Sequence, residues 1–445
     1  MSRRVVITGL GPVSGLGLGM DASWDAAVAG RSALGPIEAF DASQFDSRIA
    51  AEVSGFKVRD YVPKSYRKAT KVMARDIELA VAAADLAARD AQLATHGTSP
   101  DREPDYPPER CGAHIGAGLI AVDLDELTAA LAEAKAEGDG EGFSLHKWGR
   151  EGMNQLTPLW LLKYLPNMLA CHVTIIHGAH GPSNTITCGE ASSGLSIGES
   201  LRVIQRGGAD LCFCGGTESK LNLMAFLRQQ FTERLTTERQ DSPGEAVRPF
   251  DQAASGTAVG EGGGIVTLES WDSFAQRQEH TPEARAYAEL AGFGASQSVN
   301  REAGNLKPES DGRGISVAIK AALREAGVGA DEIDLVLPFG SGVPAWDEAE
   351  AAAMRTVFGD RLASLPVIST KPLAGNTGAG AGSLDLAIAS KALAEQTVPP
   401  VLNRDSPLDG LGTGPTEAQS AELTHALVFS AGFGGQNTAL VLRKT

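Results

Sequence analysis

Short apolar segments alternate with alanine-rich stretches along the whole chain. Runs with strand character occur at RRVVITGLG, CGAHIGAG, SNTITC, DLCFCGG and GGIVTLE, and further on at AYAELAGFGA, IDLVLPFG, PVIST, HALVFSAGFGG and NTALVLRK. Several of these runs are apolar throughout, which is typical of strands covered on both faces of a sheet. Between residues 64 and 93, Met73, Ile77, Val81 and Ala84 recur at helical spacing on one face. The pattern predicts an α/β fold, with a mixed sheet buried between helices.

Segments rich in Gly, Pro and charge separate these elements. They lie at 95–110, 135–152, 298–314 and 404–420, and we expect long loops there that border a functional face. A second series of strands and helices follows Leu268. We therefore expect two halves, residues 1–268 and 269–445, which a diverged duplication of one α/β unit would explain.

Composition narrows the classes of partner. The 445 residues include 39 Lys and Arg against 55 Asp and Glu, a net charge of −16. This balance argues against a nucleic-acid or anionic-membrane partner, because both need clustered basic charge. No apolar run approaches the roughly 20 residues of a membrane span. The five cysteines lack zinc spacing and the N-terminus lacks a signal pattern, so we expect a reduced, cytoplasmic protein with no metal site.

Several blocks, in a fixed order, carry a family resemblance. They are VVITGLGPVSGLG, LPNMLACHVTIIHGAHGPSNTIT, CGGTES, RPFD with GEGGGIVTLE, VLPFGSGVPAWDEAEA, STKPLAGN and GFGGQN. Through them the chain resembles the β-ketoacyl-(acyl carrier protein) synthases of the thiolase superfamily over essentially its whole length. The resemblance implies a thiolase-like five-layered αβαβα fold with two mixed sheets, no cofactor, and an acyl carrier protein as partner.

In that family a cysteine at a helix N-terminus is acylated, and two histidines polarise the thioester carbonyl of a malonyl unit. The family spacing from GPSN places Glu190 at the nucleophile position. The two histidine positions correspond to Phe339 and Asn376, and the family lysine remains as Lys371, with Asp385 as a match for the family acid. The resemblance therefore implies that Glu, Phe and Asn stand where the family has Cys, His and His.

These replacements change what the site can do. A carboxylate at a helix N-terminus is held ionised by the helix dipole and is a poor nucleophile toward a thioester. Phe339 cannot donate a hydrogen bond, and the loss of one oxyanion donor costs roughly 2.7–4 kcal/mol. Asn376 can donate through its amide but cannot exchange protons near neutral pH. The thiol of Cys188 lies two residues too early, a shift that a tight turn would not absorb. We expect ordinary condensation to be undetectable.

The resemblance also marks a gate and two surfaces. Phe433 corresponds to the family phenylalanine that gates the cysteine, and Ala431 replaces a neighbouring aromatic residue. Segment 156–176, with Cys171 and His172, is the expected dimer interface. The cations Lys64, Arg67 and Lys68 match a basic helix that the family uses for the acidic carrier protein, although a solvated helix face would look the same.

Three functions stay open from the sequence. The first is a partner subunit of an active ketosynthase in a heterodimer, because the chain resembles the chain-length factors of type II polyketide systems, which lack the cysteine. The second is an enzyme with altered acyl-thioester chemistry, decarboxylation or acyl transfer, that uses Glu190. The third is a homodimeric acyl or lipid binder without turnover. Glu190 itself is either an anion satisfied by helix N–H groups, a shaper of the pocket, or a new catalytic group.

Overall fold

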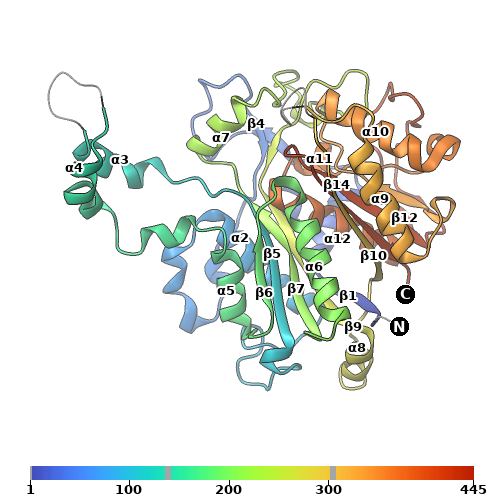
Figure 1. Ribbon diagram of the computed structural model, residues 1–445, viewed down its shortest axis with the longest axis horizontal. Helices are drawn as coiled ribbons and strands as arrows, with labels where there is room; N and C mark the ends of the chain where they lie inside the picture. The colour runs from blue at the N-terminus through green and yellow to red at the C-terminus, as the bar shows by residue number, and fades with distance from the viewer. Residues whose placement is uncertain (1–2, 136–141, 301–306) are drawn as a thin grey trace.

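A computed structural model describes residues 3–135, 142–300 and 307–445. Its centre is a continuous path of hydrogen-bonded strands in two halves (Figure 1). The first half has the order β1-β9-β7-β5-β6 and the second the order β10-β15-β14-β11. These strands are β1 (Val5–Ser14), β5 (Cys111–Ala117), β6 (Ser183–Ile186), β7 (Leu211–Glu218), β9 (Gly262–Ser270), β10 (Ala288–Gln297), β11 (Leu335–Leu337), β14 (His425–Ala431) and β15 (Gln436–Arg443). Two residue pairs, Val6 with Glu289 and Ile7 with Ala288, join β1 to β10.

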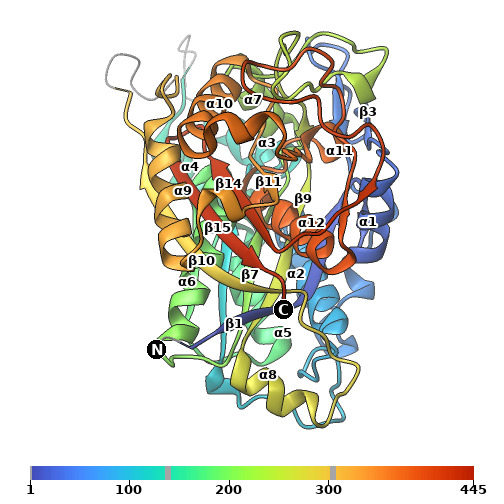
Figure 2. The same cartoon turned by 90° about the vertical axis from the view of Figure 1, so that its right-hand side faces the viewer.

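Helices form three layers around these two sheet halves (Figure 1), and Figure 2 faces the layer that covers the second half. The middle layer contains α6 (Ser192–Gln205) and α12 (Ala381–Glu395), which contact strands of both halves. The outer face of the first half is covered by α2 (Arg75–Asp90) and α5 (Met168–His177). The second half is covered by α9 (Arg313–Ala326), with α10 (Pro344–Phe358) packed against it. This is the five-layered αβαβα arrangement that the family resemblance implies.

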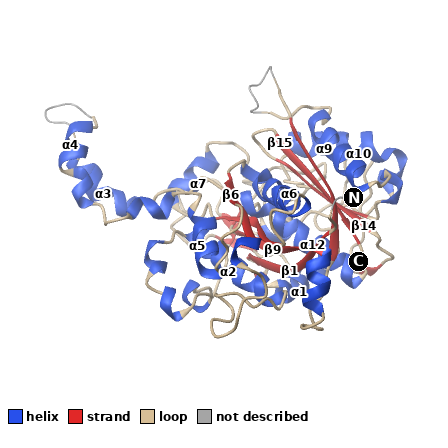
Figure 3. Cartoon of the chain, turned by 60° about the horizontal axis from the view of Figure 1, so that its bottom comes forward, coloured by secondary structure: helices blue, strands red, loops and turns tan. Residues whose placement is uncertain are grey.

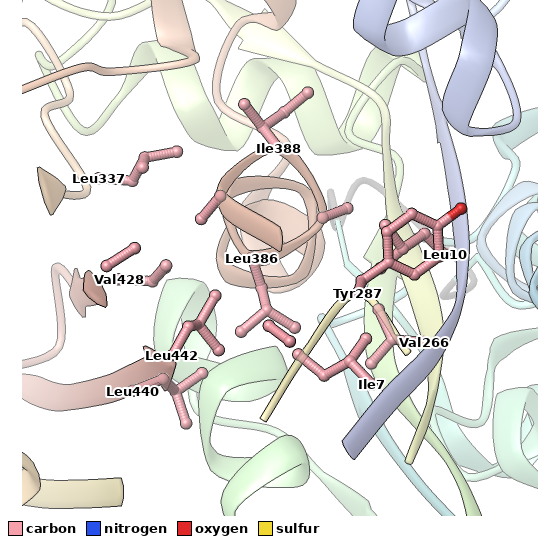
Figure 4. Close-up of a cluster of buried hydrophobic side chains, with 14 of the residues drawn as sticks. Ile7, Leu10, Val266, Tyr287, Leu337, Leu386, Ile388, Val428, Leu440 and Leu442 are labelled. Atoms are coloured by element: carbon pink, nitrogen blue, oxygen red, sulfur yellow. The ribbon is translucent and has the colours of Figure 1, made fainter. Parts of the chain in front are cut away.

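The central helix α12 consists mainly of apolar and small residues, as expected for a helix that is buried on every side. Its Leu386 and Ile388 lie among side chains from both sheet halves (Figure 4). Leu10 and Val266 come from the first half and Leu440 from the second. The largest hydrophobic cluster therefore holds the two halves together.

The two halves repeat one topology. In the first half, β1 pairs antiparallel with β9, β9 antiparallel with β7, and β7 parallel with β5. In the second half, β10 pairs antiparallel with β15, β15 antiparallel with β14, and β14 parallel with β11. Each half also has a glycine where its strand packs against a covering helix. A Cβ atom on Gly11 would lie 2.0 Å from the carbonyl oxygen of Ala83 in α2. A Cβ atom on Gly294 would lie 2.0 Å from the carbonyl oxygen of Ala318 in α9. Only glycine permits such close helix–strand packing. The boundary predicted at residue 268 falls within β9, the last strand of the first half.

Two expectations from the sequence are wrong in detail. The helix predicted from residue 64 begins at Arg75, and the segment before it forms 3₁₀ turns at Lys64–Tyr66 and Ala69–Val72. Four cations in that segment would oppose a helix dipole, whereas Asp76 and Glu78 in the first turn of α2 favour one. PVIST contributes one parallel bridge, Val336 with Val367, in place of a strand, because Pro366 has no N–H to donate.

The remaining elements surround this core. They are α1 (Met20–Val28), α3 (Leu124–Glu133), α4 (Leu145–Arg150), α7 (Leu223–Gln230), α8 (Trp271–Gln278), α11 (Lys371–Ala374), and the short strands β2 (Gly17–Leu18), β3 (Leu34–Pro36), β4 (Ile49–Ala51), β8 (Val259–Gly260), β12 (Thr397–Val398) and β13 (Gln419–Ser420). The helices α3 and α4 project as an arm (Figure 3). Parts of the loops expected at 135–152 and 298–314 lie outside the described residues. Among the described helices, none has both the length and the apolar character needed to cross a bilayer.

Candidate functional site

Glu190 lies on a tight turn between β6 and α6. Gly189 has a φ of 54°, a left-handed conformation that favours glycine, and a single 3₁₀ turn, Gly189–Ala191, leads into α6. The Ser192 hydroxyl accepts a hydrogen bond from the backbone N–H of Cys188 at 2.8 Å and donates one to the Gly189 carbonyl at 2.6 Å. The turn therefore holds Glu190, 6% exposed, just before the helix.

The carboxylate of Glu190 contacts the predicted gate. Its Oε2 atom accepts a hydrogen bond from the backbone N–H of Phe433 at 3.2 Å. The Phe433 ring meets the Phe339 ring edge-on, with 5.6 Å between centroids, and both rings pack with Trp346 and Ala381. Phe339 is fully buried. The structure thus brings together Glu190, Phe339 and Phe433, which are far apart in the sequence.

Lys371 lies behind Phe339. Its Nζ atom is 5.1 Å from the centre of the Phe339 ring and 2.6 Å from Oδ2 of Asp385, and both charged groups are buried. The Thr370 hydroxyl donates to the other Asp385 oxygen at 2.5 Å. Burial raises the pKa of Asp385 above its usual value, although Lys371 opposes that shift. The structure therefore pairs Lys371 with Asp385, the residue that matches the family acid.

The side chain of Asn376 forms a hydrogen bond within its own loop. Its Oδ1 atom accepts a hydrogen bond from the Gly378 amide at 2.9 Å, and its backbone N–H donates to the Ala258 carbonyl at 2.8 Å. Within the described residues it makes no hydrogen bond to Glu190. The Asn376 side chain therefore stabilises the turn that leads into α12.

The other sequence candidates lie around this centre. Cys188 is half-buried, and burial raises the pKa of its thiol, which disfavours the thiolate. Ala431 ends β14 and is buried beside Phe433. The burial of Cys188 therefore disfavours a nucleophilic thiolate, and the methyl side chain of Ala431 only packs.

Two cations near Glu190 were missed by sequence reasoning. Lys220 follows β7, and its Nζ lies 3.3 Å from the Glu218 carboxylate. Burial lowers the pKa of Lys220, but attraction to Glu218 and Glu190 outweighs burial, so the net shift is upward. Arg234 lies on the rings of Phe433 and Trp346, and burial lowers its pKa against the attraction of Glu190. The basic residues in CGGTESK and TERLTT are the signals that could have pointed to them.

Two buried acids of α10 hold the loop that contains Phe339. Asp347 accepts hydrogen bonds from the Phe250 and Gly342 amides at 2.8 and 3.1 Å, and burial raises its pKa to about 7. Glu350 accepts from the Gly340 amide at 3.0 Å, and burial together with Asp347 raises its pKa well above the usual value. These contacts hold the loop that contains Phe339 in place.

The predicted carrier-protein residues are exposed. Lys64 lies in a 3₁₀ turn, and Arg67 and Lys68 follow it. Arg67 also lines an adjoining groove of about 520 Å³ with three further cations and two acids, namely Lys57, Arg59, Lys71, Asp60 and Glu78. Tyr66 in the same turn shares a 2.8 Å hydrogen bond with Nδ1 of His172 in α5. The basic turn is thereby attached to the predicted interface segment.

That segment exposes apolar side chains. Leu159, Leu161 and Ile175 are 66%, 53% and 60% exposed, whereas His172 is buried. Cys171 is half-buried beside them. The neighbouring strand β6 is the last in the strand order of its half and has exposed residues. An open strand edge beside exposed apolar side chains favours an interface with another chain.

Comparison with known proteins gives a consistent result. Residues 2–273 match the family profile described as β-ketoacyl synthase, N-terminal domain, and residues 287–405 match its C-terminal domain. The chain is 32% identical to 3-oxoacyl-(acyl-carrier-protein) synthase 2 of Vibrio cholerae over 99% of both chains. It is 29% identical to the enzyme of the same name from Staphylococcus aureus, over 100% of this chain and 99% of the relative.

Solved structures agree with these matches. The ishigamide ketosynthase/chain length factor superposes with a TM-score of 0.82 at 28% identity, and a β-ketoacyl synthase from Burkholderia phymatum with 0.80 at 25%. A type II PKS acyl-carrier protein in complex with its ketosynthase, AntDE:AntF, gives 0.81 at 25% identity. Each of these comparisons covers 100% of both chains.

Proposed function

Because the chain belongs to the β-ketoacyl synthase family, we propose that it is a non-condensing partner subunit of an active ketosynthase in fatty acid or polyketide biosynthesis. One observation carries the proposal: the carboxylate of Glu190, the residue predicted to stand at the nucleophile position, accepts a hydrogen bond from the Phe433 amide. A carboxylate is a weak nucleophile toward a thioester, and the Glu190 carboxylate already accepts a hydrogen bond from the nearby Phe433 N–H.

The surroundings of Glu190 support the proposal. Phe339 offers a buried ring where the reaction needs a donor, and Asn376 is engaged by its own loop. The exposed apolar side chains of segment 156–176 and the open edge of β6 supply a surface for the partner subunit. One structural relative with 28% identity is itself a ketosynthase/chain length factor.

Intact-mass measurement tests the proposal. The purified protein is incubated with malonyl and acyl carrier proteins, alone and beside a ketosynthase that has an intact Cys-His-His set. We expect no acyl adduct on this chain and a stable heterodimer with that ketosynthase. An adduct or decarboxylation by the lone protein, abolished by Glu190→Ala, would instead establish altered acyl-thioester chemistry. A stable homodimer that retains an acyl ligand and ignores the ketosynthase would establish the acyl binder.

We further propose that the basic turn docks the acyl carrier protein. Reversing Lys64, Arg67 and Lys68 to glutamate should weaken carrier-protein binding by roughly tenfold or more and reduce its salt dependence, because exposed cations steer and hold an acidic partner. Isothermal titration at two salt concentrations measures both effects. Reversal of Arg313, Lys320 and Arg324, three cations that are exposed on α9, is the matched control. Equal losses in both variants would assign the effect to net charge alone and contradict the docking site.

A further inference from the structure

An arginine covers the gate residue of the candidate site from outside. The guanidinium carbon of Arg234 lies 4.3 Å from the centre of the Phe433 ring and 4.7 Å from that of Trp346. The two rings meet at 5.0 Å with planes at 89°, so they form a corner that holds the cation. Among the described residues, none accepts a hydrogen bond from this guanidinium. The guanidinium therefore lies on the two aromatic faces, and the charge of Glu190 attracts it from a distance.

The backbone holds Arg234 in this place. The preceding residue, Glu233, has a φ of 55°, a left-handed conformation that is costly for a residue with a side chain. The carbonyl of Arg234 accepts a hydrogen bond from the Thr257 amide at 2.8 Å, and Leu235 forms a parallel bridge with the same residue. The strained turn is thus stabilised by its neighbours, and it directs the side chain toward Phe433.

Further contacts connect Phe433, on which Arg234 lies, to the buried groups of the site. Phe433 packs on Phe339, which packs on the Lys371 ammonium, and the Phe433 amide is bonded to Glu190. Phe433 is 9% exposed and Phe339 is fully buried, whereas Arg234 is only partly buried. Arg234 is therefore the outermost layer, and any group that reaches Glu190 from this side must displace Phe433 together with its cation.

We propose that Arg234 is a plug that closes access to Glu190, and that the hydrogen bond from the Phe433 amide to Glu190 is the latch beneath it. The inference rests on the proposed function, since a subunit that does not condense has no need to admit an acyl chain to this point. The closed state uses two independent attachments, the ring corner and the latch. Loss of either one loosens the gate, and loss of the plug opens a path for an apolar acyl thioester.

Hydrogen exchange measures the closure directly. Arg234→Ala should speed amide exchange in the peptide that spans residues 428–436 by roughly tenfold or more, the size expected when two cation–ring contacts are lost. Arg234→Lys should give an intermediate rate, because an ammonium stacks less well than a planar guanidinium. Glu190→Gln keeps an acceptor oxygen and should cause a smaller increase. Arg228→Ala, at an exposed arginine of α7, is the matched control and should leave the peptide unchanged.

A binding measurement with dodecanoyl-pantetheine completes the test. We expect no binding to the wild-type protein and measurable binding to Arg234→Ala, by isothermal titration. Unchanged exchange in Arg234→Ala, or equal binding by both proteins, would overturn the plug. Neither result bears on heterodimer formation with a ketosynthase, so failure of the plug and failure of the proposed function are separate outcomes.

Discussion

Replacing Lys371 with methionine should lower the free energy of unfolding by about 3–5 kcal/mol at neutral pH. The ammonium is 1% exposed and lies 2.6 Å from the Asp385 carboxylate, which is itself fully buried. Without Lys371, the Thr370 hydroxyl is the one donor left to the charge of Asp385 among the residues that the structure describes. An uncompensated buried charge costs far more than the pair contributes when it is intact.

The pH dependence of this loss identifies its cause. Burial already raises the pKa of Asp385 in the native protein, and removal of Lys371 should raise it further. A carboxyl whose pKa is higher when folded than when unfolded costs stability as pH rises from its unfolded value, about 3.9, toward its folded value. The deficit of Lys371→Met should therefore be smallest near pH 4 and grow toward neutral pH, as measured by urea unfolding.

Two variants serve as controls for Lys371→Met. The double variant Lys371→Met with Asp385→Leu should regain much of the lost stability, because both charges are then absent. Lys320→Met removes an exposed lysine of α9 and should change stability by less than about 0.5 kcal/mol. If Lys371→Met left both the stability and its pH dependence unchanged, the pair would have no role in holding the loop beneath Phe339.

The sheet strands are the part of the fold that the sequence predicts best. Runs such as DLCFCGG and HALVFSAGFGG became β7 and β14 because buried strands need continuous apolar residues. The start of α2 was not predictable from apolar spacing alone, since Met73 falls in register with the helix but has an extended backbone. The charges decide that boundary: cations precede it and acids follow it.

Some residues of the candidate site could be predicted from the sequence, and others could not. Motif spacing was sufficient to select Glu190, Phe339 and Phe433, which tertiary contacts then bring together. It could not select Arg234, because nothing in a sequence shows that a residue following α7 will stack on a ring at the end of β14. Pairings between buried charges, such as Lys371 with Asp385, likewise depend on packing between helices that only the folded chain defines.

Asp76→Asn should stabilise the protein by roughly 2–4 kcal/mol at pH 8. Asp76 is 3% exposed in the first turn of α2, and burial together with the nearby Glu218 raises its pKa to about 7. Glu218 faces Lys220, and Glu261, which also repels Asp76, is paired with Arg75 at 2.7 Å. The neighbouring cations are thus engaged by other acids. Asparagine keeps an oxygen for the Ser219 amide, which donates to Asp76 at 3.2 Å.

The sign of the Asp76 effect follows from proton binding. The native protein binds this proton more tightly than the unfolded chain does, so wild-type stability falls as pH rises from about 4 to about 7. The gap between Asp76→Asn and wild type should widen by about 3 kcal/mol from pH 5 to pH 8, in urea unfolding at each pH. Asp272→Asn, at an exposed aspartate in the first turn of α8, should show no such widening. A constant gap would mean that Asp76 is ionised across this range, and that the cations around Glu218 and Glu261 stabilise a third carboxylate beside them.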